Sequence, residues 1–551
     1  MSLEKKFFYL FVLLAGFLLV GMPILSQDFG ITWDEWVHAH YGKLIWRYFL
    51  TWGTDQSCLT SGAGMGDFRL QYYGHLFDTI ATGVYGVVRG SLSKAVFEEV
   101  SWDRFYETKH AVNALFGCWA MIFTGLVAKE IGGWRAGFLA LVFIAATPTF
   151  FGHSMNNPKD IPFAGAYIFC LYFMIRYFKN FQTSKQKRFL GLIVSIAVAI
   201  NIRIGGLLLI GYLFFFAFLY MIQNRNHWKA LLRNVMLIGI TGYFGGLIFW
   251  PYGHQNPFVN PFLALQEMSK YQLLLGNLFE GQTILSTQVP WYYVPRWISI
   301  TAPLVVILGF IATAFVCAFR KFRLEFRIFH VGLLFFSIAF PMVYAIILKS
   351  SFYDSWRHFL FIYPPIVVLS ALAFEFGIRN LPKVGKGIVG ALILIMLADP
   401  IKWMIKNHPH QYVYFNQSIS GLDGAFSNYD TDYWGNSLRL GAEWLGRYIK
   451  DQGIQGPVIV SADGSIVQTA YYLRRDLGDQ YVPFNLDLHR EHWWDYGLVL
   501  SRNWRKKDLL SGAWPPPGTI HEIKADNVTL CAVVKIIDFY RMNKEKAFQG
   551  R

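Results

Sequence analysis

Charged side chains are scarce in this sequence. Asp, Glu, Lys and Arg make up 15% of the 551 residues, whereas soluble proteins are typically about a quarter charged. Hydrophobic residues make up 54%, and the mean hydropathy is positive at +0.33. This composition excludes an ordinary soluble domain and indicates a membrane protein. The five cysteines show no CxxC or metal-type spacing, so neither a cysteine-ligated metal site nor a disulfide framework is expected.

Acidic residues are fewer than basic ones, and the formal net charge is +15. The basic residues fall in short clusters between apolar runs, where they act as topology signals rather than as a stripe that follows nucleic acid phosphates. We therefore expect no nucleic acid partner. The sequence also lacks a low-complexity linker and a convincing internal repeat.

Apolar windows of about 17 to 22 residues are long enough to cross a hydrocarbon core of ~30 Å. They predict about eleven transmembrane helices near 7–26, 108–128, 135–150, 160–178, 188–203, 205–223, 230–250, 298–318, 327–348, 357–377 and 384–404. "NIRIGG" interrupts the pair at 188–223 as either a tight hairpin or a broken segment, which leaves the count open by one or two. The first window has a basic start and no small-residue cleavage site, so it is expected to be a retained helix.

Lysines and arginines mark one side of the membrane. If the N-terminus is cytoplasmic, the alternate loops inside carry the basic clusters, which are Lys5, Lys6, Lys129, Arg135, Arg176, Lys179, Lys185, Lys187, Arg188, Arg225, Lys229, Arg233, Arg320, Lys321, Arg323, Arg327, Arg379, Lys383 and Lys386. The other side then holds loop 27–107, the short loop "FGHSMNNPKD", the turn at Arg203, loop 251–297, "KSSFYDSWRH" and everything after about 405. An odd number of spans places the tail outside.

Two outer regions are too structured to be connectors. The first outer loop, 27–107, has helical periodicity in "DFRLQYYGHLFDTIATGVYGVVRG" and "SLSKAVFEEVSWDRFYETKH", which predicts surface helices, the second capped by Ser91 or Ser93. The tail has short strand patterns in "GPVIVSADG", "YGLVLSR" and "LCAVVKIIDF", and amphipathic helix patterns in "SIVQTAYYLRRD" and "SLRLGAEWLGRYIK". We therefore predict a transmembrane domain at 1–407 and an extracytoplasmic α/β domain at 408–551.

Six motifs carry a family resemblance through their order and their shared side of the membrane. They are "WDE", "HSMNNPKDIPFA", "QVPWYYVPRW", "SWRHFLFIYPP", "HPHQYVYFN" and "YDTDYWG". The chain resembles the GT-C superfamily of membrane glycosyltransferases, and within it the bacterial protein-mannosyltransferase-like family, glycosyltransferase family 39. The resemblance implies a GT-C-like fold in the bacterial inner membrane and hexosyl or pentosyl transfer from a polyprenyl-phosphate-linked sugar. It also implies a glycan, lipid or protein acceptor on the outer face and no metal or other cofactor, although the outer acids could ligate a divalent cation.

Inverting transfer from a polyprenyl phosphate needs one carboxylate to accept the acceptor's proton, because the phosphate leaves without protonation. By resemblance to the family's Asp-Glu pair, Asp34 is predicted to be this base. Glu35 is its neighbour in the chain and points in another direction, so it is expected to position the acceptor or a basic residue. The alternative for Asp34 is a cap on a helix that begins near Trp36.

The leaving phosphate also needs cations. The outer loops offer Lys159, Arg203, Arg357 and His358, together with the carboxylate of Asp160. Arg357 is preferred to His358 as the main phosphate contact because its planar fork stays charged. The alternatives are structural: Asp160 as a helix cap after the "NNP" turn, and Arg357 snorkelling to lipid headgroups. "DTDYWGNS" is interpreted as a linking turn whose aromatic residues pack on the membrane domain.

Two other functions compete with an enzyme. In a lipid or solute transporter, or flippase, the charges would line a path, but that function predicts inverted repeats and ionisable residues near mid-bilayer, which the sequence lacks. A scaffold that uses the tail as a binding module would not require polar residues gathered on one side of the membrane.

Overall fold

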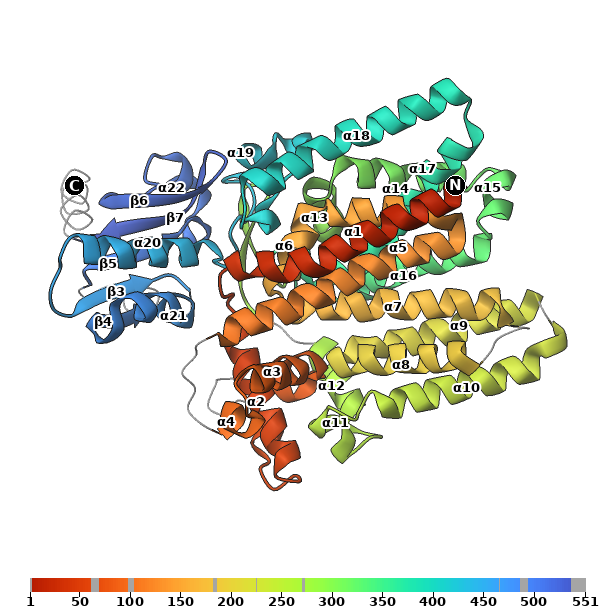
Figure 1. Cartoon of the computed structure of the whole chain (residues 1–551), viewed down its shortest axis with the longest axis horizontal. Coiled ribbons are helices and arrows are strands. Elements are labelled where there is room, and N and C mark those ends of the chain that lie inside the picture. The colour runs from red at the N-terminus through yellow and green to blue at the C-terminus, as the bar shows by residue number, and fades with distance from the viewer. Residues whose placement is uncertain are drawn as a thin grey trace.

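The computed structural model describes the whole chain except residues 1, 61–68, 98–103, 182–185, 224, 270–272, 465, 486–493 and 537–551. Long helices lie roughly side by side in one bundle, and a smaller α/β unit sits at one end of it (Figure 1). The N-terminus lies at the opposite end of the bundle from this unit. This arrangement confirms the predicted fold class, an α-helical membrane-type domain followed by a C-terminal α/β domain.

Most helices of the bundle are joined by short connections. Their bounds are α1 Leu3–Leu25, α5 Phe105–Ala145, α6 Pro148–Asn156, α7 Asp160–Lys179, α8 Gln186–Ile202, α9 Leu207–Gln223, α10 Trp228–Gly245, α11 Pro251–Gln255, α12 Asn260–Ser269, α13 Tyr293–Thr301, α14 Leu304–Val316, α15 Arg320–Glu325, α16 Ile328–Ile347, α17 Tyr363–Asn380 and α18 Lys383–Lys406. The longest connections are the first outer loop, between α1 and α5, and the segment with the β1–β2 hairpin (276–285), between α12 and α13. A 3₁₀ turn, η7 (Arg357–Ile362), leads directly into α17.

Each of the eleven predicted windows coincides with helix. Seven helical segments of the described chain are long and apolar enough to cross a membrane, and three shorter apolar helices accompany them. Windows 108–128 and 135–150 form the two arms of α5, which bends at Gly133, where φ is 84°. Window 298–318 is divided between α13 and α14. How many of these helices cross the membrane remains a prediction.

Burial differs sharply among the helices. In the apolar windows of α7 and of η7 with α17, 83% and 89% of residues are buried, against 17% for α1 and 22% for α18. An apolar helix exposed on its outer side suits contact with lipid, whereas one buried on all sides forms the centre of the bundle. α7 and α17 are therefore central helices, and Asp160 and Arg357 lie at their starts.

The first outer loop folds into short helices beside the bundle: α2 Glu35–Leu50, α3 Leu76–Val88 and α4 Leu92–Phe97. The backbone N–H of Lys94 donates to Ser91 Oγ at 3.2 Å, as expected for a serine cap. The predicted helices at 67–90 and 91–110 are longer than the observed ones, and parts of both lie outside the described residues. The prediction of a short loop over "FGHSMNNPKD" is wrong, because α6 continues through most of it.

The C-terminal domain is a five-stranded mixed sheet with helices packed on it. Its elements are α20 Ser437–Asp451, β3 Val458–Ala462, α21 Ile466–Leu477, β4 Tyr481–Asn485, β5 Tyr496–Leu500, α22 Lys506–Leu510, β6 Thr519–Ala525 and β7 Val528–Lys535. A short helix, α19 Gly421–Ala425, precedes them and packs with the bundle. The strand order is β4-β3-β5-β7-β6, with β3 parallel to β4 and β5, and β7 antiparallel to β5 and β6. The predicted strands and helices of the tail are confirmed, whereas β4, β6 and the hairpin β1 (Gly276–Phe279) with β2 (Gln282–Leu285) were not predicted.

The segment between α18 and α20 belongs to the core of the bundle. Tyr412, Phe415, Tyr433 and Trp434 are buried in the same apolar cluster as the central helices, whereas Leu438 begins the core of the α/β sheet. The aromatic residues of "DTDYWGNS" therefore pack on the membrane domain, as predicted.

Candidate functional site

Asp34 is the last residue before α2, and both domains fix its position. Gly30 N–H donates to Asn436 Oδ1 at 2.6 Å, and Ile31 N–H donates to Tyr472 Oη at 3.1 Å. The Asp34 side chain makes no capping hydrogen bond to α2. Asp34 therefore occupies the N-cap position of α2, as the alternative predicted, but its side chain does not cap the helix and its carboxylate is available to other groups.

Arg357 lies at the centre of the site. Its Nη1 is 3.5 Å from Asp34 Oδ2 and 3.4 Å from Asp160 Oδ2, and its Nε is 3.3 Å from Asp354 Oδ2. The guanidinium also lies 5.0 Å from the ring centres of Tyr353 and Trp434. Only 4% of this side chain is exposed, so Arg357 does not snorkel to the membrane surface.

Asp160 connects Arg357 to a second arginine. Arg203 Nη2 lies 2.6 Å from Asp160 Oδ1, where the helical backbone is interrupted between α8 and α9. The cap on α7 comes instead from Asn157, whose Oδ1 accepts from Asp160 N–H at 2.9 Å. The predicted capping role of Asp160 is therefore wrong, and its side chain pairs with both arginines.

Lys159 joins the same cluster from the residue before α7. Its Nζ lies 3.7 Å from the ring centre of Tyr73, in the first outer loop. Burial lowers the pKa of Lys159 to about 8, although the nearby carboxylate of Asp34 acts in the opposite direction. Near neutral pH this side chain is therefore charged, but it loses its proton more readily than an ordinary lysine.

Of the two remaining predicted residues, His358 joins the cluster and Glu35 does not. His358 packs on Tyr353 with ring centres 4.7 Å apart, and among the described residues its Nδ1 has no hydrogen-bond partner. Glu35 is fully buried and faces away from the cluster, because His110 Nε2 lies 2.9 Å from its Oε2. Glu35 therefore holds a basic neighbour, one of the two roles expected for it.

Two further members of the cluster, Asp354 and Arg502, were not predicted as site residues. Arg502 of the C-terminal domain lies with Nη2 2.5 Å from Asp354 Oδ1. Asp354 and Ser355 both adopt positive φ, 57° and 64°, a costly conformation for residues other than glycine that is often found at functional sites. Asp354 could have been found from its spacing of three residues before Arg357, whereas nothing local to Arg502 indicates its partner.

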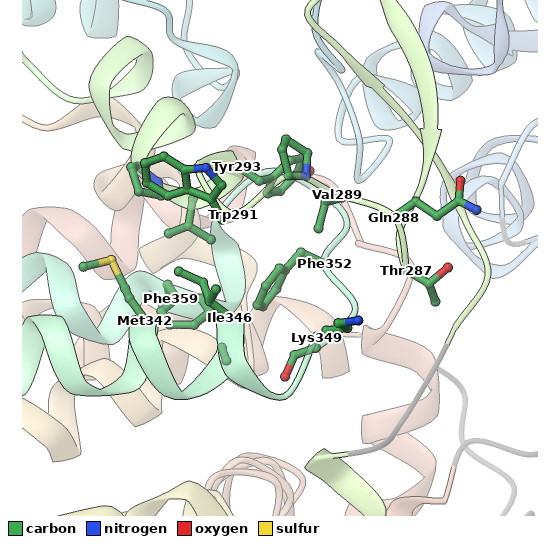
Figure 2. A pocket seen from close by; sticks show the side chains of 15 residues that line it. Thr287, Gln288, Val289, Trp291, Tyr293, Met342, Ile346, Lys349, Phe352 and Phe359 are labelled. Atoms are coloured by element: carbon green, nitrogen blue, oxygen red, sulfur yellow. The ribbon is translucent and has the colours of Figure 1, made fainter.

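One large cavity borders this cluster, and two others are lined by residues outside it. A cavity of about 860 Å³ lies between Asp34 and the C-terminal domain, and an apolar one of about 750 Å³ lies between α9, α10, α12 and α16. Figure 2 shows a smaller one of about 270 Å³, where Phe352 and Phe359 lie close to Ile346 near the end of α16, with Lys349 alongside. Asp34 thus borders a cavity on one side and Arg357 on the other.

In the described part of the chain, one group of side chains could hold a metal ion. The Nδ1 atoms of His38 and His75 lie 3.1 Å and 3.3 Å from Asp78 Oδ2, and all three residues are buried. Lys109 Nζ is 3.6 Å from the other oxygen of Asp78, so that oxygen already has a basic partner. Burial lowers the pKa of His38 to about 4, so its imidazole is neutral near pH 7. We assign this group to the attachment of α2 to α3, and the expectation of metal-independent chemistry remains a prediction.

Residues 109–252 match the family described as dolichyl-phosphate-mannose-protein mannosyltransferase. This match confirms, for the segment that it covers, the resemblance indicated by the motifs. No curated protein sequence matches the chain.

Solved structures of similar overall shape include ArnT from Cupriavidus metallidurans bound to undecaprenyl phosphate, with 14% identity and a TM-score of 0.48, covering 95% of this chain and 97% of that one. They also include the oligosaccharyltransferase AglB from Archaeoglobus fulgidus in complex with an inhibitory peptide and a dolichol-phosphate. That likeness has 11% identity and a TM-score of 0.49, and it covers 93% of this chain and 72% of the other.

Proposed function

We propose that this protein is an inverting glycosyltransferase that moves a hexose or pentose from a polyprenyl phosphate to an acceptor hydroxyl at the outer face of a bacterial inner membrane. The position of Asp34 carries the proposal. Its carboxylate, 37% exposed, lies between the buried cation Arg357 and the 860 Å³ cavity. A base in inverting transfer needs this position, with the acceptor on one side and the departing phosphate on the other.

Asp34 and the cations have different roles in the proposed reaction. Asp34 accepts the proton of the acceptor hydroxyl as its oxygen forms a bond to the anomeric carbon. The bond from that carbon to the phosphate oxygen breaks, and the polyprenyl phosphate leaves with the electron pair. Arg357, Arg203 and Lys159 would stabilise its negative charge in a site where burial strengthens the attraction.

The apolar cavity fits the lipid part of such a donor. Leu207, Leu208 and Ile210 line it, so it opens within the first turn of α9, close in sequence to Arg203. Its other walls come from α10, α12 and α16, with Phe258 just before α12, and carry mostly aromatic and aliphatic side chains. A prenyl chain placed there would bring its phosphate toward Arg203, because the arginine immediately precedes the η5 turn (Ile204–Gly206) that leads into α9.

The test is to incubate the purified protein with labelled polyprenyl-phosphate sugars and crude envelope as acceptor, and to follow loss of the lipid-linked label. We expect Asp34→Asn to keep donor binding and to lower turnover by roughly 10²–10⁴-fold, because the amide cannot accept the proton. Asp28→Asn is the matched control, because Asp28 lies in the same segment with 55% of its side chain exposed and pairs with His408 at the surface.

The result also separates the proposal from a transporter. If several donors remain intact with wild-type protein, or if Asp34→Asn turns over normally, the transferase proposal is wrong. Movement of intact donor across reconstituted vesicles would support the alternative of a flippase.

A further inference from the structure

The cavity beside Asp34 is built by both domains. The start of α2 and the hairpin β1–β2 supply one side, and the loops after β3 and β5 supply the other. Its volume of about 860 Å³ lies within the range of roughly 300–1,000 Å³ that is usual for small-molecule sites. A ligand here would touch the membrane domain and the tail together.

Three tryptophans lie on the walls of this cavity: Trp33, Trp36 and Trp504. All three are half-buried. Trp504 also packs against Trp514, with ring centres 5.5 Å apart, so its ring is held in place. Fixed aromatic faces of this kind suit a ligand that is apolar on one face and polar at its edge, such as a sugar ring whose C–H groups stack on the indole.

The charged groups of the cavity disfavour an anionic ligand. Asp34, Asp354 and Asp430 line it together with two cations, Arg502 and Arg505. Both cations are already paired, Arg502 with Asp354 and Arg505 with Asp508. A phosphate would meet these carboxylates, whereas hydroxyl groups can donate hydrogen bonds to them. The cavity therefore favours a neutral ligand with several hydroxyl groups.

An extended peptide fits less well beside β1. Asp430 N–H donates to Leu278 O at 3.1 Å, and Leu278 N–H donates to Asp430 Oδ2 at 3.1 Å. The backbone of β1 is thus already paired at this point with the segment that leads to the tail. A peptide acceptor could not add a strand there by backbone hydrogen bonds.

We infer that this cavity binds the acceptor, and that the acceptor is a carbohydrate whose ring stacks on Trp504 and whose hydroxyls are held by Asp430 and Asp34. The inference rests on the proposed function and names its acceptor class. Asp34 would take the proton of the reacting hydroxyl, and Asp430 would hold a second hydroxyl and fix the orientation of the ring. Burial raises the pKa of Asp430 to about 7, so near neutral pH this group is able to donate as well as accept a hydrogen bond.

Binding can be tested without the donor. Saturation-transfer NMR on the full-length protein in detergent, with maltose, mannobiose and chitobiose as probes, should show transfer to at least one disaccharide. Trp504→Ala should weaken that binding roughly tenfold, whereas Trp504→Phe keeps an aromatic face and most of the affinity. Trp52→Ala is the matched control, because Trp52 is 96% exposed and does not line the cavity, and it should leave binding unchanged.

A second variant distinguishes loss of acceptor binding from misfolding. Asp430→Asn is nearly isosteric and keeps an oxygen for Leu278 N–H. It should raise the KM for the sugar acceptor several-fold while leaving the KM for the lipid-linked donor unchanged.

The outcomes separate the two proposals. If donor is consumed but no disaccharide binds, and label passes to a Ser/Thr-containing peptide instead, the carbohydrate inference is overturned and the transferase proposal stands. If a disaccharide binds and Trp504→Ala abolishes binding while no donor is consumed, the sugar site is supported and the transferase proposal fails. If wild type, Trp504→Ala and Asp430→Asn bind the disaccharide equally well, the disaccharide does not bind in this cavity.

Discussion

The two ends of the helical bundle use the same kinds of charged residue in different ways. At the end near the N-terminus, which we name the basic end, Arg135 pairs with Glu375 through two contacts of 2.7 Å and 3.0 Å. Arg379 lies 2.5 Å from the same glutamate and 2.6 Å from Glu325. At the opposite end, the site end, Arg357 faces three carboxylates, all of them 3.3–3.5 Å away.

The difference separates the close pairing of Arg135 and Arg379 from the looser pairing of Arg357. Arg203 and Arg502, which also lie at the site end, pair closely with Asp160 and Asp354. Short, two-pronged pairs such as Arg135 with Glu375 use the full hydrogen-bonding geometry of the guanidinium and attach helices to one another. Arg357 is more deeply buried but more loosely paired, and it borders the cluster that also holds Arg203 and Lys159. A buried cation with long contacts to its carboxylate partners can form shorter hydrogen bonds to a phosphate that binds beside it.

The largest expected contrast between the ends is accessibility. A cysteine at Gln452, exposed in the C-terminal domain, should react with a membrane-impermeant thiol reagent in intact cells, and one at Lys386, exposed in the first turn of α18, should react only after lysis. Four of the five native cysteines are buried, so background labelling is expected to be low. The reverse labelling pattern would place Asp34 on the cytoplasmic side and overturn the topology.

Next in size is the loss of donor affinity on removal of Arg357. Arg357→Ala should cost about 1–3 kcal/mol of donor binding, and Arg357→Lys less, because lysine keeps the charge but not the planar fork. Titration with a polyprenyl phosphate measures both. Arg379→Ala, at the basic end, should lower thermal stability and leave donor affinity unchanged. If Arg379→Ala lowered donor affinity as much as Arg357→Ala does, both effects would come from folding rather than from a contact with the donor.

A glycine in the first outer loop gives a third test. A Cβ on Gly74 would lie 2.2 Å from the backbone oxygen of Asn201, so this glycine lets the loop that carries Tyr73 approach the residues just before Arg203. Gly74→Ala should cost roughly 1–3 kcal/mol of stability and weaken donor binding, because the loop must move away. Gly16→Ala, which meets nothing within 4 Å, is the control. Unchanged donor binding in Gly74→Ala would separate the loop from the site.

The smallest effect concerns pH. Because burial lowers the pKa of Lys159 to about 8, its charge is present below that pH and is lost above it. The KM for donor should therefore rise by up to about tenfold between pH 7 and 9, and Lys159→Arg should flatten the profile, since arginine stays charged. Lys43, whose pKa burial also lowers to about 8, lies over the Phe105 ring instead, and Lys43→Arg should keep the wild-type profile. A flat profile in wild type would argue against a phosphate contact from Lys159.

Local pattern predicted much of the fold. Apolar windows marked the helices, and short strand-like apolar runs marked β3, β5 and β7, because these strands are buried almost throughout. β6 and the hairpin at 276–285 were not predicted, because their residues are mostly half-buried or exposed and show little apolar alternation. The "FGHSMNNPKD" loop was mistaken because Asn-Pro signals a turn, whereas packing in the bundle keeps the preceding residues helical.

The sequence by itself determined that this chain is a helical membrane-type protein with an α/β tail, because hydropathy and periodicity are properties of adjacent residues. It also indicated Asp34, Asp160, Arg203 and Arg357, because charges between apolar segments are costly and therefore noticeable. Only the tertiary structure decided that Arg357 joins Asp34, Asp160 and Asp354, and that Arg502 reaches Asp354 from the other domain. Pairing between distant segments depends on how helices and domains pack, and no local pattern records which distant charge will lie within reach.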